Sequence, residues 1–101
     1  MARNVTKSVR YIFYRKEAFC LQQAITLKTS REGGFWVHSY KPLGIDAYGR
    51  TKLDALAAFA MELSSAWHWI AKQPDDKLAA DALELKRKLT SLVASVRPLR
   101  V

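Results

Sequence analysis

The sequence has few of the residues that cross-link chains, bind metals or catalyse reactions. Cys20 is the only cysteine, so an internal disulfide is impossible and a metal site built from several cysteines is excluded. The only histidines are His38 and His68, and neither has neighbours or spacing typical of a metal site. Glycine-rich phosphate-binding motifs are missing as well. We therefore expect no enzyme, no cofactor and no metal.

Long apolar runs are also missing. None approaches the ~20 residues that a membrane-spanning helix needs. The first 15 residues carry positive charge but no long apolar segment and no small-residue cleavage site, so we expect no secretory signal. With 101 residues, half of them apolar, the chain has room for one domain with one core, and we expect it in the cytoplasm.

Negative charge is scarce near the start of the chain. The formal net charge is +8, and residues 1–31 have seven basic side chains against the single acid Glu17. Residues 32–77 are close to neutral, and residues 78–101 are basic again. This asymmetry fits a nucleic-acid partner or an acidic protein partner, and it fits a solvated basic surface equally well.

Alternating apolar residues predict an antiparallel sheet of three or four strands over residues 9–48. Residues 9–14 and 19–29 are rich in β-branched and aromatic types, and a turn at residues 15–18 would pair them. In the second run one parity is apolar apart from Gln23: Phe19, Leu21, Ile25 and Leu27.

Turn residues mark the later strands. Gly33 and Gly34 can take positive φ, as a tight hairpin requires, and residues 35–40 then alternate again. Pro42 has no amide donor, so strand pairing should stop there. Residues 43–48 predict a short further strand whose inward side is Leu43, Ile45 and Ala47.

A first helix is predicted over residues 52–72. Thr51 can cap it, with Asp54 at the capping-box position and Gly49 in the left-handed conformation before it. The helix has an inward stripe and a second apolar set beside it, so a further element should pack there. The stripe is Leu53, Leu56, Ala57, Ala60, Leu63, Trp67 and Ile70, and the second set is Ala55, Phe59, Ala66 and Trp69.

A second helix is predicted over residues 76–96, with Asp75 or Asp76 as its N-cap. Its narrow apolar seam suits packing against the first helix. The seam consists of Leu78, Ala82, Leu85, Leu89, Leu92 and Val96. The fold class is therefore α+β, with strands in β-β-β order followed by two helices, one of them packed across the sheet. We expect a single domain over residues 1–101, in which residues 1–8 form a flexible basic tail.

The surface chemistry indicates binding. Aromatic residues of the sheet could form a base-stacking platform for RNA, although such residues more often build a core. These aromatics are Tyr11, Phe13, Tyr14, Trp36, Tyr40 and Tyr48. The candidate residues for binding a protein partner or nucleic acid are Arg10, Tyr14, Arg15, Lys28, Arg31, Trp36, His38 and Tyr40. A small sheet also leaves an exposed edge, so we expect a homodimer joined at an edge or at the leucine seams.

Three consecutive stretches have a characteristic order of parts. An acidic-glycine turn opens a strand in SREGGFWV, an extended piece follows in SYKPLGIDAYG, and a Gly-x-Thr step starts an alanine-rich helix in GRTKLDALAAFAMEL. Over residues 22–66 this order resembles the HicB-like antitoxin core. The resemblance implies a partial RNase H-like fold without catalysis, in which a three-stranded antiparallel sheet carries a helix on one face. Many members add a C-terminal DNA-binding segment, which the predicted second helix does not match.

The sequence thus predicts a non-enzymatic, antitoxin-like protein that acts by protein–protein interaction with a toxin or a similar partner. One alternative is a small basic nucleic-acid-binding module. Another is a phage-type inhibitor protein. In the antitoxin reading, nucleic-acid binding by the isolated chain would be weak.

Overall fold

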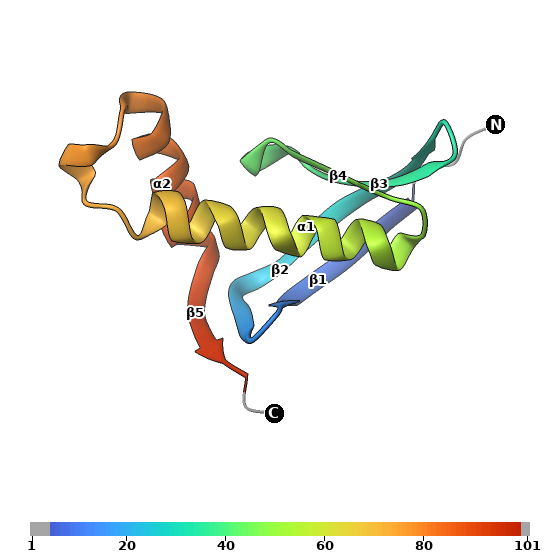
Figure 1. Ribbon diagram of the computed structural model, residues 1–101, viewed down its shortest axis with the longest axis horizontal. Helices are drawn as coiled ribbons and strands as arrows, with labels where there is room; N and C mark the ends of the chain where they lie inside the picture. The colour runs from blue at the N-terminus through green and yellow to red at the C-terminus, as the bar shows by residue number, and fades with distance from the viewer. Residues whose placement is uncertain (1–4, 100–101) are drawn as a thin grey trace.

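The computed structural model describes residues 5–99 and confirms the α+β class (Figure 1). Most of the sheet precedes two helices, and a last strand returns to it. In chain order the elements are β1 (Val5–Tyr14), β2 (Glu17–Glu32), β3 (Phe35–Tyr40), the 3-10 turn η1 (Lys41–Leu43), β4 (Ile45–Gly49), α1 (Lys52–Ala66), the π-helical η2 (Trp67–Ala71), the 3-10 turn η3 (Asp75–Lys77), α2 (Ala80–Leu92) and β5 (Val93–Pro98).

The sheet is antiparallel, in the order β1-β2-β3-β4, and its long strand β2 has two partners on one edge. Residues 17–20 and 25–29 of β2 pair with β1. On the opposite edge, residues 28–32 pair with β3 and residues 17–21 pair with β5. The edge of β2 between these two segments has no partner strand among the described residues.

Two tight hairpins join the first three strands. In the second hairpin Glu32 pairs with Phe35, and Gly33 and Gly34 both have positive φ, at 52° and 84°, as predicted. In the first hairpin Tyr14 pairs with Glu17, and Arg15 takes φ 53°. A non-glycine residue with positive φ is uncommon, and the sequence carried no signal for it.

A register shift in the β1–β2 pair accounts for the exception at Gln23. Val9 pairs with Ile25, whereas Tyr11 pairs with Cys20, so β2 has extra residues between these two points. Gln23 lies in this irregular segment and is exposed. The apolar parity of β2 resumes after it.

Helix α1 lies across one face of the sheet, but its buried side differs from the predicted stripe (Figure 1). Leu53 is 75 % exposed and Ala57 is exposed as well, so the predicted stripe is wrong at its start. The best-buried residues of α1 are Ala55, Phe59, Ala60 and Leu63. Two apolar stripes are compatible with the same periodicity, and only contact with the sheet selects the one that is buried.

Gly49 determines how closely α1 approaches β4. The predicted left-handed conformation is wrong, because the positive-φ glycines are Gly33, Gly34 and Gly44. A Cβ at residue 49 would instead lie 2.2 Å from the backbone nitrogen of Ala55. The absence of a side chain therefore lets the first turn of α1 rest on β4. The predicted N-cap is confirmed, since the Asp54 N–H donates to Thr51 Oγ1 over 3.0 Å.

The second helix ends four residues earlier than predicted. Leu89 is fully buried and α2 packs against η2, but the chain leaves the helix after Leu92 and continues as β5. Val96 therefore pairs with Phe19 in the sheet and does not extend the helical seam. The β-branched Val93 and Val96 suit a strand, and the free edge of β2 offers them hydrogen-bond partners.

Two smaller expectations also change. Residues 5–8 of the predicted tail belong to β1 and pair with residues 26–29, while residues 1–4 lie outside the described part of the chain. Neither Asp75 nor Asp76 is the N-cap of α2, because the helix begins at Ala80, four residues later than predicted, with Ala79 as its N-cap. Asp75 Oδ1 instead accepts from Lys86 Nζ over 2.7 Å. This hydrogen bond holds the pKa of Asp75 below its ordinary value. Among residues 5–99, no helix is long and apolar enough to cross a membrane.

Candidate functional site

Strand β1 forms one edge of the sheet and exposes apolar side chains there. Within residues 5–99 it pairs only with β2, so its outer backbone groups are open to a further strand. Ile12 is 2 % exposed and faces α1, whereas Tyr11 and Phe13 are 57 % and 59 % exposed. Since side chains alternate along a strand, Tyr11 and Phe13 point away from α1.

An apolar hollow of about 260 Å³ lies between this edge and α1. Its lining contains no charged residue: Tyr11, Ile12, Phe13, Leu53, Leu56, Ala57 and Ala60. Leu53, which the sequence placed in the core, is the most exposed of the large apolar residues in this lining. A group of exposed apolar side chains beside an unpaired strand is typical of an interaction surface.

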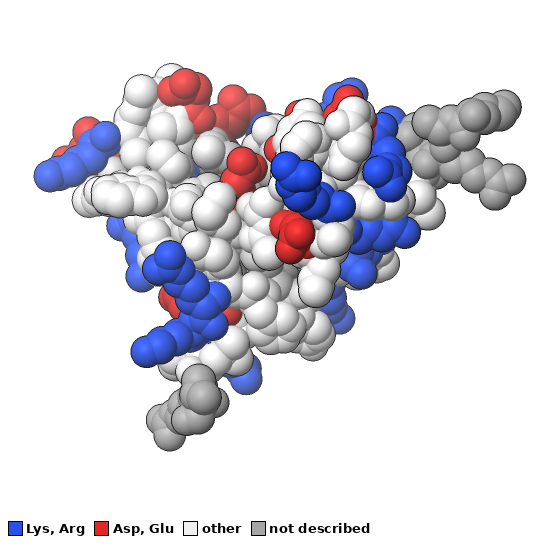
Figure 2. Space-filling model, turned by 45° about the vertical axis from the view of Figure 1, so that its right-hand side comes forward, with Lys and Arg blue, Asp and Glu red and all other residues white. Residues whose placement is uncertain are grey.

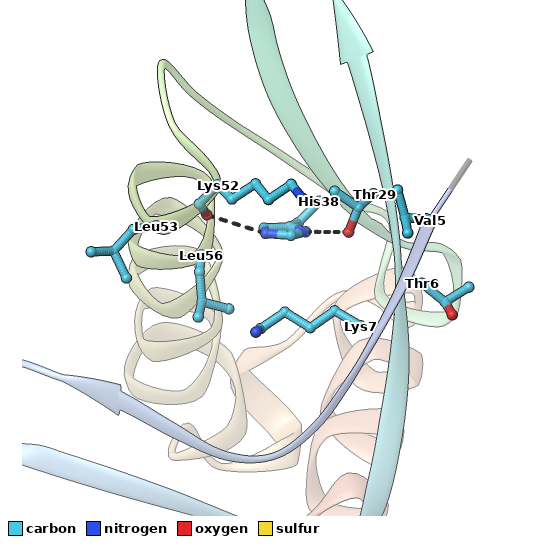
Figure 3. A pocket seen from close by; sticks show the side chains of 8 residues that line it. All are labelled: Val5, Thr6, Lys7, Thr29, His38, Lys52, Leu53 and Leu56. Atoms are coloured by element: carbon cyan, nitrogen blue, oxygen red, sulfur yellow. Dashed lines mark hydrogen bonds between the residues drawn. The ribbon is translucent and has the colours of Figure 1, made fainter. Parts of the chain in front are cut away.

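A basic pocket of about 370 Å³ continues the hollow toward the start of β1 (Figure 3). The two cavities share Leu53 and Leu56, and we call them together the edge groove. The basic pocket is lined by Val5, Thr6, Lys7, Thr29, His38, Lys52, Leu53 and Leu56. Lys7 reaches from β1 toward Leu56 across the opening (Figure 3).

His38 forms the floor of the basic pocket and is only 1 % exposed. Its Nε2 lies 3.2 Å from the Lys52 carbonyl oxygen, which can only accept, so Nε2 carries a proton. Its Nδ1 lies 2.9 Å from Thr29 Oγ1, and in the neutral ring it accepts from that hydroxyl. Burial lowers the pKa of His38, and the charges of Lys7 and Lys52 lower it further. The imidazole is therefore held neutral beneath two ammonium groups.

Lys52 also belongs to an aromatic-cation cluster. Its Nζ lies 4.7 Å from the centroid of the Trp36 ring, and the Arg31 guanidinium lies 4.9 Å from the same centroid. Arg31 and Trp36 are directly opposite each other on β2 and β3. The cluster continues the positive charge of the basic pocket along the same face of the sheet.

The eight residues predicted from the sequence divide into separate locations. Arg15 stacks on Tyr14 at 5.4 Å beside the first hairpin, while Arg31 and Trp36 lie at the other end of β2. The Arg10 side chain reaches the Gln22 carbonyl at 3.5 Å on the register-shifted segment. The structure therefore assembles Arg31 with Trp36, but it does not bring the full set together.

Two of these residues are part of the interior. His38 is buried, so it is not a surface contact for a macromolecular partner. Tyr40 is partly buried and packs edge-on against Phe59 at 6.5 Å between ring centroids. Lys28 is exposed and, with Tyr40, lines a hollow of about 850 Å³ beside the unpaired part of β2.

The proposed base-stacking platform is not present as a single surface. Trp36 and Tyr40 share the parity of the buried His38, on the α1 side of the sheet, whereas Tyr11, Phe13 and Tyr48 point to the other side. On the face shown in Figure 2, basic side chains also form separate groups with acidic ones between them. A continuous stacking or phosphate-binding track is therefore not found on that face.

Sequence reasoning missed Lys7, Lys52, Leu53 and Leu56 as site residues. The two lysines lie far apart along the chain, and no local motif connects them. One signal was available for Leu53. It is an apolar residue next to the N-cap of a helix that has more apolar surface than one sheet can cover, so part of that surface must face something else.

The remaining reactive side chains have structural partners. His68 Nε2 and Glu17 Oε1 lie 2.6 Å apart and connect η2 to the start of β2. Cys20 is half-buried in β2. Across residues 5–99, no three histidine, cysteine or acidic side chains are grouped as metal ligands.

No family model, curated protein or solved structure matches this chain. The relation to HicB-like antitoxins therefore stays a prediction based on the motifs of residues 22–66.

Proposed function

We propose that this chain is a non-enzymatic binding protein that masks a toxin or a similar protein partner in the cytoplasm, as an antitoxin does. The edge groove carries this proposal. It combines an unpaired strand edge with the exposed Leu53 on the α1 side and the exposed Tyr11 and Phe13 on the other side, so a partner strand would gain both main-chain hydrogen bonds and apolar contact there.

The groove favours a protein partner over nucleic acid. Its apolar half has no positively charged lining residue, and the aromatics that could stack on bases are divided between two faces of the sheet. The Arg31–Trp36–Lys52 cluster and the basic charge of residues 1–31 favour nucleic acid as a second candidate.

Co-expression tests the proposal. The chain is produced with the product of the reading frame next to its gene, and growth and co-purification are measured. We expect the full chain to relieve growth inhibition and to co-purify, and Leu53→Glu to lose both effects. Met61→Glu is the matched control, because Met61 is an exposed apolar residue of the same helix outside the groove. Relief that persists equally in both variants would contradict the proposal.

A further inference from the structure

The two ends of the edge groove differ in chemistry, which restricts what can bind there. One end is lined by apolar side chains, and the other has Lys7 and Lys52 with no acid in its lining. Building on the proposed function, we propose that the occupant is an extended, acidic-apolar segment of a partner protein. It adds to β1 as a further strand, with a carboxylate at the Lys7–Lys52 end and apolar side chains at the Phe13–Ala60 end.

Strand geometry sets the length of this segment. From Val5 to Phe13 the edge covers ~26 Å at about 3.3 Å per residue, so roughly eight residues of partner can pair along it. Alternate side chains of an added strand would point to opposite faces. One set would enter the groove against Ile12, Leu53 and Leu56, and the other would contact Tyr11 and Phe13.

The basic end is suited to a carboxylate. Neither Lys7 nor Lys52 forms an ion pair with an acid anywhere in residues 5–99. Lys7 is paired with the fully buried Leu27 across the sheet, so its side chain points to the groove side. Below it His38 is neutral, and both its ring nitrogens are already hydrogen-bonded, to Thr29 and to Lys52. The ligand therefore does not need to supply a hydrogen bond to this side chain.

Lys7 also makes the edge selective. A charge that points inward from an edge strand discourages pairing with an arbitrary strand, because the added strand would bury it without a partner. A strand with an acid at that position removes this cost and gains a charge-assisted hydrogen bond. The same lysine thus disfavours neutral and basic strands.

A second copy of this chain is a poor occupant for the same reason. Its own β1 edge carries Lys7 and Arg10, with Arg15 and Lys16 in the adjoining turn. β1 itself has no acidic residue, and Glu17, just after the turn, is engaged by His68 at 2.6 Å. Two such edges would bring like charges together, whereas an acidic segment complements them.

A library of random twelve-residue peptides, selected against the full chain, tests the inference. We expect the enriched peptides to have acidic residues toward one end and apolar residues toward the other, and a synthetic copy to slow amide hydrogen exchange in residues 7–13. Lys7→Glu should weaken that peptide at least about tenfold, and replacing the peptide's acids by lysine should restore binding to this variant. Lys77→Glu, on an exposed turn, is the control that should bind as the parent does.

The contrary outcomes are distinct. The inference would be overturned if no peptide is enriched or if the enriched peptides are basic or free of charge. It would also be overturned if the peptide protects a region other than β1. Self-association that protects β1 would show that a second copy occupies the groove and would also overturn it. If peptides bind elsewhere while co-expression still relieves growth inhibition, the proposed function stands and only this assignment fails.

Discussion

His38 and Thr29 face each other across β2 and β3, with the threonine Oγ1 2.9 Å from the histidine Nδ1. Together with the Lys52 carbonyl on Nε2, this contact joins the centre of the sheet to the first turn of α1. The floor of the edge groove is therefore a buried, fully hydrogen-bonded imidazole beside two lysines.

This arrangement predicts a pH-dependent stability. Burial first, and then the charges of Lys7 and Lys52, hold the pKa of His38 below its ordinary value of about 6.5. The unfolded chain therefore binds a proton at higher pH than the folded chain does. The contribution of neutral His38 is complete above about pH 6.5 and is lost as the pH falls through the folded pKa. Urea unfolding should show a smaller loss between pH 7 and pH 5 in His38→Gln than in the parent, and equal losses would contradict the assignment.

Leu89 on α2 should be important for stability. It is fully buried, so Leu89→Ala should lower the free energy of unfolding by ~2–5 kcal/mol. Leu53→Ala is the matched control, because Leu53 is 75 % exposed and its truncation should change the free energy by less than about 0.5 kcal/mol. Chemical denaturation of both variants measures the difference. Similar small values would show that α2 does not pack as described.

Gly49 should not tolerate a side chain. The added methyl group of Gly49→Ala would lie 2.2 Å from the Ala55 backbone nitrogen, so α1 would have to move away from β4. We expect a loss of at least ~1–3 kcal/mol, the range for overpacking. Gly34→Ala is the comparison, because it has open space and only the strain of a positive φ. Thermal unfolding should place Gly49→Ala below Gly34→Ala, and the reverse order would count against the close approach.

Nucleic-acid binding by the isolated chain should be weak and without sequence preference. Several phosphate contacts would produce a steep fall of affinity with salt, and changing Arg10, Arg15 and Lys28 to glutamate would abolish such binding. Fluorescence titration with duplex and single-stranded oligonucleotides at two salt concentrations measures both effects. Tight, sequence-selective binding would support the nucleic-acid module instead.

Two of the surfaces that could join the expected homodimer are unsuitable for that contact. The leucine seam of α2 packs against η2 within the chain, and the β1 edge carries repelling charges. Strand β4 is the other outer strand of the main sheet path and exposes Tyr48 at 52 %, so we expect pairing there. Sedimentation at micromolar concentration should give the mass of two chains, and Tyr48→Lys should lower it. A single-chain mass that does not change with concentration would reject the dimer.

Features that depend on neighbours in sequence could be read from the sequence. Gly33 and Gly34 take the positive φ of a two-residue hairpin, and Thr51 caps α1, because these preferences are local. The alternation of Phe19, Leu21, Ile25 and Leu27 identified the buried face of β2 for a similar reason.

Features that depend on distant contacts were decided by the tertiary structure. The 4-3 apolar spacing up to Val96 allowed a longer helix, but the unpaired edge of β2 offered residues 93–98 a strand partner, and sheet hydrogen bonds replaced helical ones. The close approach of Gly49 to Ala55 and the exposure of Leu53 beside the edge groove both depend on how α1 packs on the sheet. Lys7 and Lys52 share a pocket because α1 packs on the face of the sheet to which the Lys7 side chain points. Local propensity cannot predict such a contact, because the contact arises from packing between segments far apart in the chain.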